Sequence, residues 1–307
     1  MVRCHIASST PFYTQSYASN MLANVLIPVY SSTLSALEIV SLKQCLRILK
    51  QHPITLVTNK KVDLTVYKEA YREEGVVFNL ELFEETFFGS VFAYSQLLLN
   101  RSFYQRFAQY DYVLIYQLDG FVFKDELAYW CSKNFDYIGA PWFLHYGKGY
   151  TGNKLWKVGN GGVSLRKVST ILNTFDAPFP LLSSWFFIKS IRLKQLIPMS
   201  LRTLRMLFVL IFTKKTVESI LNEYTDERVN EDCFWAEAFQ HTNLKLHIPD
   251  VLTGARFCLE KKPSYVYNLI GKQLPFCCHA FEKFEYENFW KEIIQREGPS
   301  TPINQNH

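Results

Sequence analysis

The sequence predicts an α/β protein built around a mainly parallel sheet flanked by helices, and two observations support this prediction. Short apolar segments typical of strands alternate with segments of helical periodicity, which indicates right-handed βαβ units. The clearest strand opens the stretch 112–123, where Val113, Leu114 and Ile115 are apolar at successive positions. Such a run is typical of a parallel strand buried on both faces. With 307 residues, 48% of them hydrophobic, the chain can bury a substantial core.

The individual elements follow from local patterns along the chain. Residues 24–30 read as an apolar strand, and residues 34–49 carry apolar side chains at helical spacing. The remaining strands are expected at 54–58, at 76–80, in the stretch 112–123 up to Asp119 and at 137–138, with short ones near 246–248 and 255–257. The remaining helices are expected at 62–73, 87–107 and 126–133 and from Asn230, whose side chain suits an N-cap.

We expect one domain over residues 24–297, because no linker or repeat divides it. An irregular arm (1–23) precedes this domain, and a disordered polar tail (298–307) follows it. Within the domain, residues 179–215 are strongly apolar and basic, without one acidic residue. This composition is typical of an interfacial helix pair, so residues 181–215 are a candidate contact with an anionic membrane surface. The alternative is a helical insertion packed on the core with a solvated basic face.

The net charge and the cysteine content of the sequence indicate which partners the protein binds and in which cellular compartment it lies. The net charge of +5 is mild and the basic residues are scattered, which argues against a nucleic-acid partner. Seven cysteines without a CxxC spacing indicate a reducing compartment. The first residues have no apolar core typical of a secretory signal. We therefore expect a cytoplasmic protein, with a peripheral place at the inner face of the cell membrane if the basic segment binds lipid.

Two motifs lie where a parallel sheet would place a ligand. Asp119 follows the buried strand, and ligands of open α/β folds bind outside the carboxyl ends of strands. A carboxylate is costly to bury there unless it faces a metal ion, a hydrogen-bond donor or water. Alternatively, Asp119 caps the turn that follows the strand. The segment 159–162 places three glycines around Asn160, which permits close backbone approach or simply a tight turn. Its spacing is that of neither a P-loop nor a dinucleotide-binding motif.

Two further motifs offer acid–base and ligand groups. Glu231 and Asp232 open a helix, either as favourable charges at its N-terminus or as a general base for an acceptor hydroxyl. In the second case the helix start is expected to lower the pKa of the carboxyl and keep it ionised. His279 is either a satisfied core residue or, with Asp119, part of a site for Mn²⁺ or Mg²⁺. A zinc site with Cys277 and Cys278 is disfavoured, because adjacent ligands strain tetrahedral geometry.

The order of these motifs resembles the GT-A class of nucleotide-sugar glycosyltransferases. The segments YDYVLIYQLDGFVF, DYIGAPW, GNGGVSLR, NEDCFW and PFCCHAF look more closely like a bacterial glycosyltransferase-like domain family of surface-polysaccharide gene clusters. The resemblance covers roughly residues 24–294 and accounts least for the insertion at 179–215. It implies a GT-A-like fold, a nucleotide-sugar donor and a glycan or lipid-linked saccharide acceptor.

The resemblance also implies roles for individual residues. In GT-A enzymes an acidic DxD motif ends a strand, and its last carboxylate holds the metal on the donor diphosphate. Here the motif reads Gln117-Leu118-Asp119, so only the last acid is retained and Gln117 would bond the ribose or a sugar hydroxyl. Asp232, or Glu231 beside it, would be the base of an inverting displacement, and His279 the late metal ligand. The remaining implied contacts are Asn160, Gly161 and Gly162 for the donor, Pro28, Tyr30, Thr58 and Asn59 for its nucleotide, and Trp142 for the acceptor sugar.

Two other functions fit parts of the same pattern. A GT-A fold that has lost catalysis and serves as a sugar-binding or assembly module would explain Gln117 in place of an acid. A nucleotidyltransferase shares the fold and a metal site, but it needs a Gly-rich basic loop after the first strand, and residues 28–36 offer none.

Overall fold

The computed structural model of the protein describes residues 22–144, 152–178, 216–224, 230–237, 239 and 244–299. The expectations for the arm up to residue 21, for the helical insertion at 179–215 and for the tail from residue 300 fall outside these residues. The membrane contact expected of residues 181–215 therefore also lies outside them. Among the described helices, none is both long enough and apolar enough to cross a bilayer.

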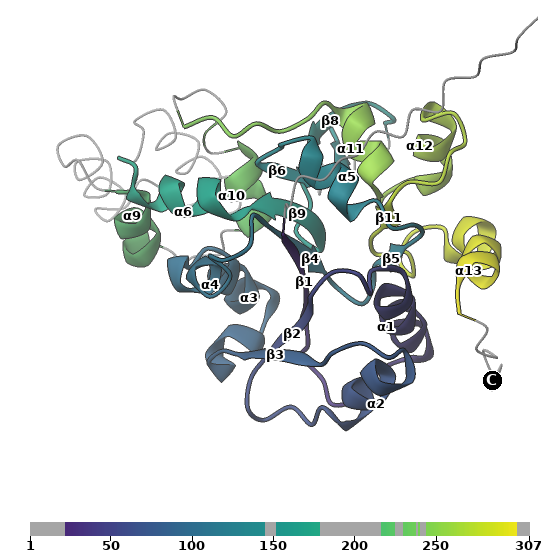
Figure 1. The fold of residues 1–307 in the computed structure, drawn as a ribbon. Coiled ribbons are helices and arrows are strands. Elements are labelled where there is room, and N and C mark those ends of the chain that lie inside the picture. The colour runs from purple at the N-terminus through teal and green to yellow at the C-terminus, as the bar shows by residue number, and fades with distance from the viewer. Residues whose placement is uncertain are drawn as a thin grey trace, which may run out of the picture.

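A six-stranded sheet forms the centre of the fold, with the strand order β3-β2-β1-β4-β9-β6 (Figure 1). The first four strands in this order are parallel to one another, whereas β9 is antiparallel to both of its neighbours. The strands are β1 (Ala23–Pro28), β2 (Ile54–Thr58), β3 (Asn79–Leu82), β4 (Tyr112–Tyr116), β6 (Tyr137–Gly139) and β9 (Val163–Lys167). The prediction of an α/β fold with a mainly parallel sheet is confirmed.

Helices cover both faces of this sheet, as the two-sided burial of β4 requires. Leu114 packs into the core on one side, and Val113 and Ile115 pack into the core on the other. The first core receives side chains from α1 (Ala36–Ile48), α2 (Thr65–Glu73) and α5 (Leu127–Ser132). The second receives them from α3 (Val91–Leu98), α4 (Arg101–Gln105), α6 (Val168–Asp176), α9 (Val217–Tyr224) and α10 (Glu231–Glu237).

Two small sheets and the C-terminal helices complete the described part of the fold. In one sheet β11 (Cys277–Cys278) lies between β10 (Cys258–Leu259), to which it is parallel, and β5 (Phe121–Val122), to which it is antiparallel. The other sheet pairs β7 (Pro141–Phe143) with β8 (Leu155–Val158). The remaining elements are η1 (Glu85–Phe88), α11 (Val251–Phe257), α12 (Pro263–Leu269), η2 (Tyr286–Trp290) and α13 (Lys291–Glu297).

The structure corrects several predicted elements. The expected strand at 255–257 is the end of α11, because Asp250 caps that helix by accepting from the backbone N–H groups of Leu252 and Thr253. The expected strand at 246–248 does not form, because this extended segment bonds to the loop at Asp136 through His247 rather than to a strand. The helical stretch 87–107 divides into η1, α3 and α4, and the third strand begins at Asn79 rather than 76.

Candidate active site

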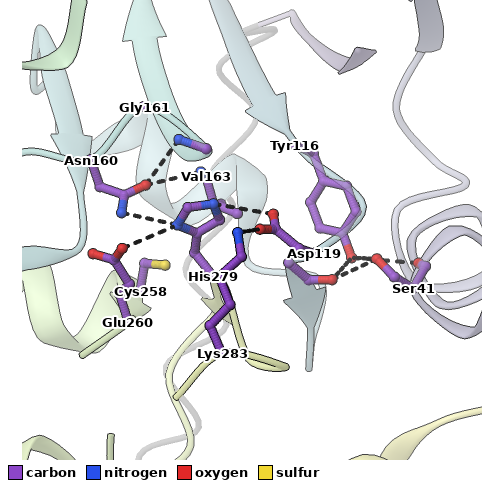
Figure 2. Close-up of polar contacts among 12 residues, drawn as sticks. Ser41, Tyr116, Asp119, Asn160, Gly161, Val163, Cys258, Glu260, His279 and Lys283 are labelled. Atoms are coloured by element: carbon purple, nitrogen blue, oxygen red, sulfur yellow. Dashed lines mark hydrogen bonds and ion pairs between the residues drawn. The ribbon is translucent and has the colours of Figure 1, made fainter. Parts of the chain in front are cut away.

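Asp119 lies in the turn that joins β4 to β5, and three side chains bond to the backbone that follows it; two of them, Ser41 and Tyr116, are labelled in Figure 2. The hydroxyls of Ser41 and Tyr116 both donate to the carbonyl of Gly120, at 2.5 and 3.1 Å. Gln44 Nε2 donates to the carbonyl of Val122 at 2.8 Å. Ser41 and Gln44 belong to α1, so this helix fixes the backbone on the C-terminal side of Asp119.

Two cationic groups face the two oxygens of the Asp119 carboxylate (Figure 2). His279 Nε2 lies 3.2 Å from Oδ1, and Lys283 Nζ lies 3.0 Å from Oδ2. Burial alone would raise the pKa of Asp119, but His279 and Lys283 outweigh burial and lower the pKa below its usual value. The carboxyl at the end of β4 is therefore ionised at neutral pH.

Asn160 and Glu260 contact the other ring nitrogen of His279. Asn160 Nδ2 lies 3.0 Å from His279 Nδ1, and Glu260 Oε1 lies 3.7 Å from it. Asn160 has a left-handed backbone (φ 75°), and its Oδ1 accepts from the backbone N–H groups of Gly162 and Val163. Burial opposes the charged imidazole, but the carboxylates of Asp119 and Glu260 outweigh burial and raise the pKa of His279 to about 10.

The glycines of the segment 159–162 allow close approach of two catalytic candidates. A Cβ on Gly162 would overlap the imidazole of His279, and a Cβ on Gly161 would overlap the Glu231 carboxylate. The same Cβ on Gly161 would lie 3.5 Å from Cβ of Asp232. The segment thus lies between His279 on one side and the start of α10 on the other. Glycine is required at 161 and 162 because any side chain there would overlap Glu231 or His279.

We expect Gly162→Ala to destabilise the protein by about 1–3 kcal/mol, because the added methyl must displace a buried imidazole. Urea unfolding measures this change. Gly89→Ala is the matched control, since a Cβ at Gly89 meets nothing within 4 Å. Equal unfolding midpoints for the two variants would show that His279 does not pack on Gly162.

Glu231 is neutralised by a buried partner. Arg166 Nη2 lies 3.0 Å from both carboxylate oxygens of Glu231, and the Arg166 side chain is fully buried. Arg166 also donates to the hydroxyls of Tyr104 and Ser164. The ion pair with Arg166 therefore anchors Glu231 in the core. Of the two adjacent carboxyl groups, Asp232 is the one that Arg166 does not engage, so it is the candidate base.

Asp232 is half-buried at the start of α10, where its Oδ1 accepts from the backbone N–H of Cys233 at 2.7 Å. Burial raises the pKa of Asp232 above its usual value, against the lowering effect of that backbone N–H. The expectation that the helix start lowers the pKa is wrong for this residue, because desolvation outweighs the helix dipole. A raised pKa brings a carboxylate closer to the range of an effective general base.

The residues expected to line a nucleotide pocket differ in accessibility. Pro28 is buried, and Thr58 is fully buried with its hydroxyl donating to the carbonyl of Val29, so both shape the strand ends rather than a pocket wall. Tyr30 is 46% exposed, and its ring packs edge-on against that of Tyr94, with ring centroids 5.5 Å apart. Gln117 has a neutral amide at the position where the DxD motif has an acid. Burial raises the pKa of the Tyr94 hydroxyl, and Gln117 acts to lower it.

Asn59 follows β2 and lines a cavity of about 800 Å³. Residues of the β3 end, η1 and α4 complete the wall, among them Lys60, Lys61, Phe83, Phe87 and Arg106. This volume lies within the range of small-molecule sites in proteins. The cavity opens beside the carboxyl ends of β2 and β3, on the side of β1 away from Asp119.

The structure argues against Trp142 as an accessible sugar platform. Trp142 is 3% exposed, and its ring packs against Gly159, where a Cβ would overlap it. Trp156 lies beside it, with ring centroids 6.5 Å apart, and is 39% exposed. Of the two rings, the more exposed is that of Trp156, which sequence reasoning missed, and Lys157 Nζ lies over it at 4.6 Å from the centroid.

The facing atoms of Asp119 and His279 would fit a divalent cation in place of the proton that His279 Nε2 holds toward Asp119, because a ligating imidazole nitrogen must be unprotonated. Within the described part of the chain, Asp119 Oδ1 and His279 Nε2 are buried and lack a partner with hydrogen-bond geometry. Their 3.2 Å separation suits two neighbouring ligands of one ion, since ligands at about 2.1 Å and right angles lie roughly 3 Å apart. The described residues contain no group of three His, Cys, Asp or Glu side chains able to hold a metal, and Asp119 and His279 are the two candidate ligands that face each other there.

The fold is that of an α/β protein. Its candidate site brings together the Asp119 carboxylate at the end of β4, the His279 imidazole and the half-buried Asp232 carboxyl around the glycines of segment 159–162. The chain belongs to the family described as "Protein of unknown function (DUF5672)", whose sequence model matches residues 77–279. This match includes Asp119, Asn160, Asp232 and His279. A search of curated proteins found no match.

Several solved structures are similar to this chain, and those compared here are glycosyltransferases. GlyE of Streptococcus pneumoniae has 13% identity and a TM-score of 0.43, covering 91% of this chain and 60% of GlyE. Mouse xyloside xylosyltransferase 1 has 12% identity and a TM-score of 0.44, covering 84% and 96%. Core-mannan synthase A of Aspergillus fumigatus, solved in an Mn/GDP form, has 12% identity and a TM-score of 0.38, covering 73% and 71%. At these values the similarities do not identify the activity or substrate of this chain.

Proposed function

We propose that this protein is a nucleotide-sugar glycosyltransferase. It transfers a sugar, with inversion, from a nucleotide-sugar donor to a hydroxyl of a glycan or lipid-linked saccharide in surface-polysaccharide biosynthesis. The observation that supports this most strongly is the facing pair of Asp119 Oδ1 and His279 Nε2, with Asp232 across the glycine turn. A lipid-linked acceptor would place the enzyme at the inner face of the cell membrane.

In the proposed reaction Asp119 and His279 would hold Mn²⁺ or Mg²⁺, with the imidazole nitrogen unprotonated. When bound, such an ion neutralises the charge that develops on the departing nucleoside diphosphate. The backbone of Gly161 and Gly162 would lie against the donor sugar, since these glycines hold the segment between His279 and the start of α10. Tyr30 and Asn59 contact the nucleotide from the ends of β1 and β2.

Asp232 acts as the general base in this proposal. It takes the proton of the acceptor hydroxyl while the hydroxyl oxygen bonds to the anomeric carbon and the bond from that carbon to the diphosphate oxygen breaks. One displacement inverts the anomeric configuration. Glu231 fixes the start of α10 through Arg166, and Trp156 offers its exposed ring to the acceptor sugar.

We expect one class of nucleotide sugar to raise the melting temperature of the protein, and to do so more strongly with Mn²⁺, since ligand binding stabilises the folded state by mass action. A thermal-shift screen of UDP-, GDP- and CMP-sugars with and without Mn²⁺ tests this. Asp119→Asn is the variant expected to lose the Mn²⁺-dependent part of the shift. The absence of any shift with every donor would contradict the proposal.

A sugar-binding or assembly module is the second candidate function. Gln117 favours it, because a neutral amide occupies the position of the first acid. The two functions differ in the product: a module binds a sugar without releasing a nucleoside diphosphate.

A further inference from the structure

Lys283 is a charged residue that the proposed reaction does not use, yet it contacts the central carboxylate of the site. Its Nζ lies 3.0 Å from Oδ2 of Asp119, while Oδ1 of the same carboxylate faces His279 (Figure 2). One oxygen of Asp119 is thus directed at the candidate cation site, and the other is paired with an internal cation.

The backbone places Lys283 at this position. The N–H of Phe281 donates to the carbonyl of Asp119 at 3.2 Å, which ties the segment after β11 to the turn that carries the carboxylate. Ala280 then has a left-handed backbone (φ 51°), and the N–H of Lys283 donates to its carbonyl at 3.0 Å. A tight turn therefore returns the Lys283 side chain toward Asp119.

The two partners differ in exposure. The side chain of Lys283 is 67% exposed, whereas that of Asp119 is 23% exposed. The ammonium can exchange Asp119 for water at small cost, because exposed ion pairs contribute little free energy. The carboxylate lacks this freedom, so Lys283 is the partner that moves when another ligand enters.

Lys283 also changes the charge that a divalent cation meets. Ligand charge count is a main determinant of cation affinity at oxygen sites. Asp119 is the one acid of the segment Gln117–Asp119, and its charge is balanced by Lys283. A free cation therefore meets an Asp119 carboxylate whose charge Lys283 already balances, and the other nearby acid, Glu260, lies 3.7 Å from the far ring nitrogen of His279. A bound anion would add the negative charge that Lys283 offsets.

We propose that Lys283 makes cation binding at Asp119 and His279 depend on the donor nucleotide. A nucleoside diphosphate supplies the negative charge that Lys283 cancels, and it offers the ammonium a second anion. Cation and diphosphate then bind together more tightly than either binds alone, and this coupling acts equally in both directions. The inference rests on the proposed donor and cation sites and assigns their mutual dependence to one side chain.

The test measures Mn²⁺ binding to the full chain by electron paramagnetic resonance, alone and with UDP, GDP or CDP. We expect Lys283→Met to bind Mn²⁺ alone about tenfold more tightly than the wild type and to gain less from the nucleotide. Lys283→Arg, which keeps the charge, should behave as the wild type. Lys291→Met is the matched control, because it removes a lysine from another exposed ion pair, with Glu287.

The outcomes separate this inference from the proposed function. If a nucleotide raises the Mn²⁺ affinity of the wild type and of Lys283→Met by the same factor, the role of Lys283 is overturned and the proposed function stands. An unchanged Mn²⁺ affinity of Lys283→Met without nucleotide overturns it too. If no variant binds Mn²⁺ with any of the three nucleotides, the proposed function fails and the inference with it.

Discussion

Asp232→Asn is expected to abolish sugar transfer while leaving nucleotide-sugar binding nearly unchanged. The amide keeps the size of the carboxyl but cannot take the proton of the acceptor hydroxyl. General bases typically contribute about 10²–10⁴-fold to the rate, and a loss of that size is expected in kcat. Release of nucleoside diphosphate measures transfer, and the thermal shift with the donor measures binding.

Glu237→Gln is the control for this variant. Glu237 is the last residue of α10, is also partly buried, and has Lys157 at 3.9 Å. The replacement makes the same change of charge on the same helix and is expected to leave transfer within a few-fold of the wild type. A fully active Asp232→Asn enzyme would refute the assignment of the base.

Arg166→Met is expected to lower the free energy of unfolding by about 3–5 kcal/mol, because removal of one partner leaves Glu231 as an uncompensated buried charge. The tyrosine and serine hydroxyls that accept from Arg166 lose their donor as well. Chemical denaturation measures the loss. The double variant Arg166→Met with Glu231→Leu should recover much of it, since the orphaned carboxylate is then gone.

Arg106→Met provides the comparison for Arg166→Met. Arg106 also pairs with a glutamate, at 2.8 Å from Glu81, but its side chain is 47% exposed. Its replacement is expected to cost about 0–1 kcal/mol, as for other exposed pairs. Similar losses for the two arginine variants would mean that the Arg166–Glu231 pair is not isolated from solvent.

The sequence predicted the central sheet well because its strands carry their signal locally. Residues 54–58 are β2 as predicted, and 112–116 are β4, since each run is short, apolar and buried on both faces. The segments 246–248 and 255–257 were predicted wrongly for a physical reason. Short apolar runs do not distinguish a strand from a helix turn or an extended loop, and a cap or a non-local bond decides between them.

The site was predicted in part. Asp119, Asn160, Gly162 and His279 contact one another in the structure, although 160 positions separate the first and the last. The choice between Glu231 and Asp232 depends on a buried contact with Arg166, which local sequence does not reveal.

The remaining site residues gave little local signal. Glu260 and Lys283 reach the site only through the pairing of β10, β11 and β5, so neither could be placed by local pattern. For Trp142, an aromatic residue near a ligand motif indicated stacking, whereas packing on Gly159 determines its environment.

The pairing of β5 with β11 has a consequence for the order in which the protein matures. Asp119 comes just before β5, His279 comes just after β11, and Phe121 is the register partner of Cys278. During synthesis all six strands of the central sheet, which ends at Lys167 in the sequence, emerge before the histidine that faces Asp119. Under the proposed function, the nascent chain would therefore bind neither cation nor donor until its last quarter has left the ribosome and docked.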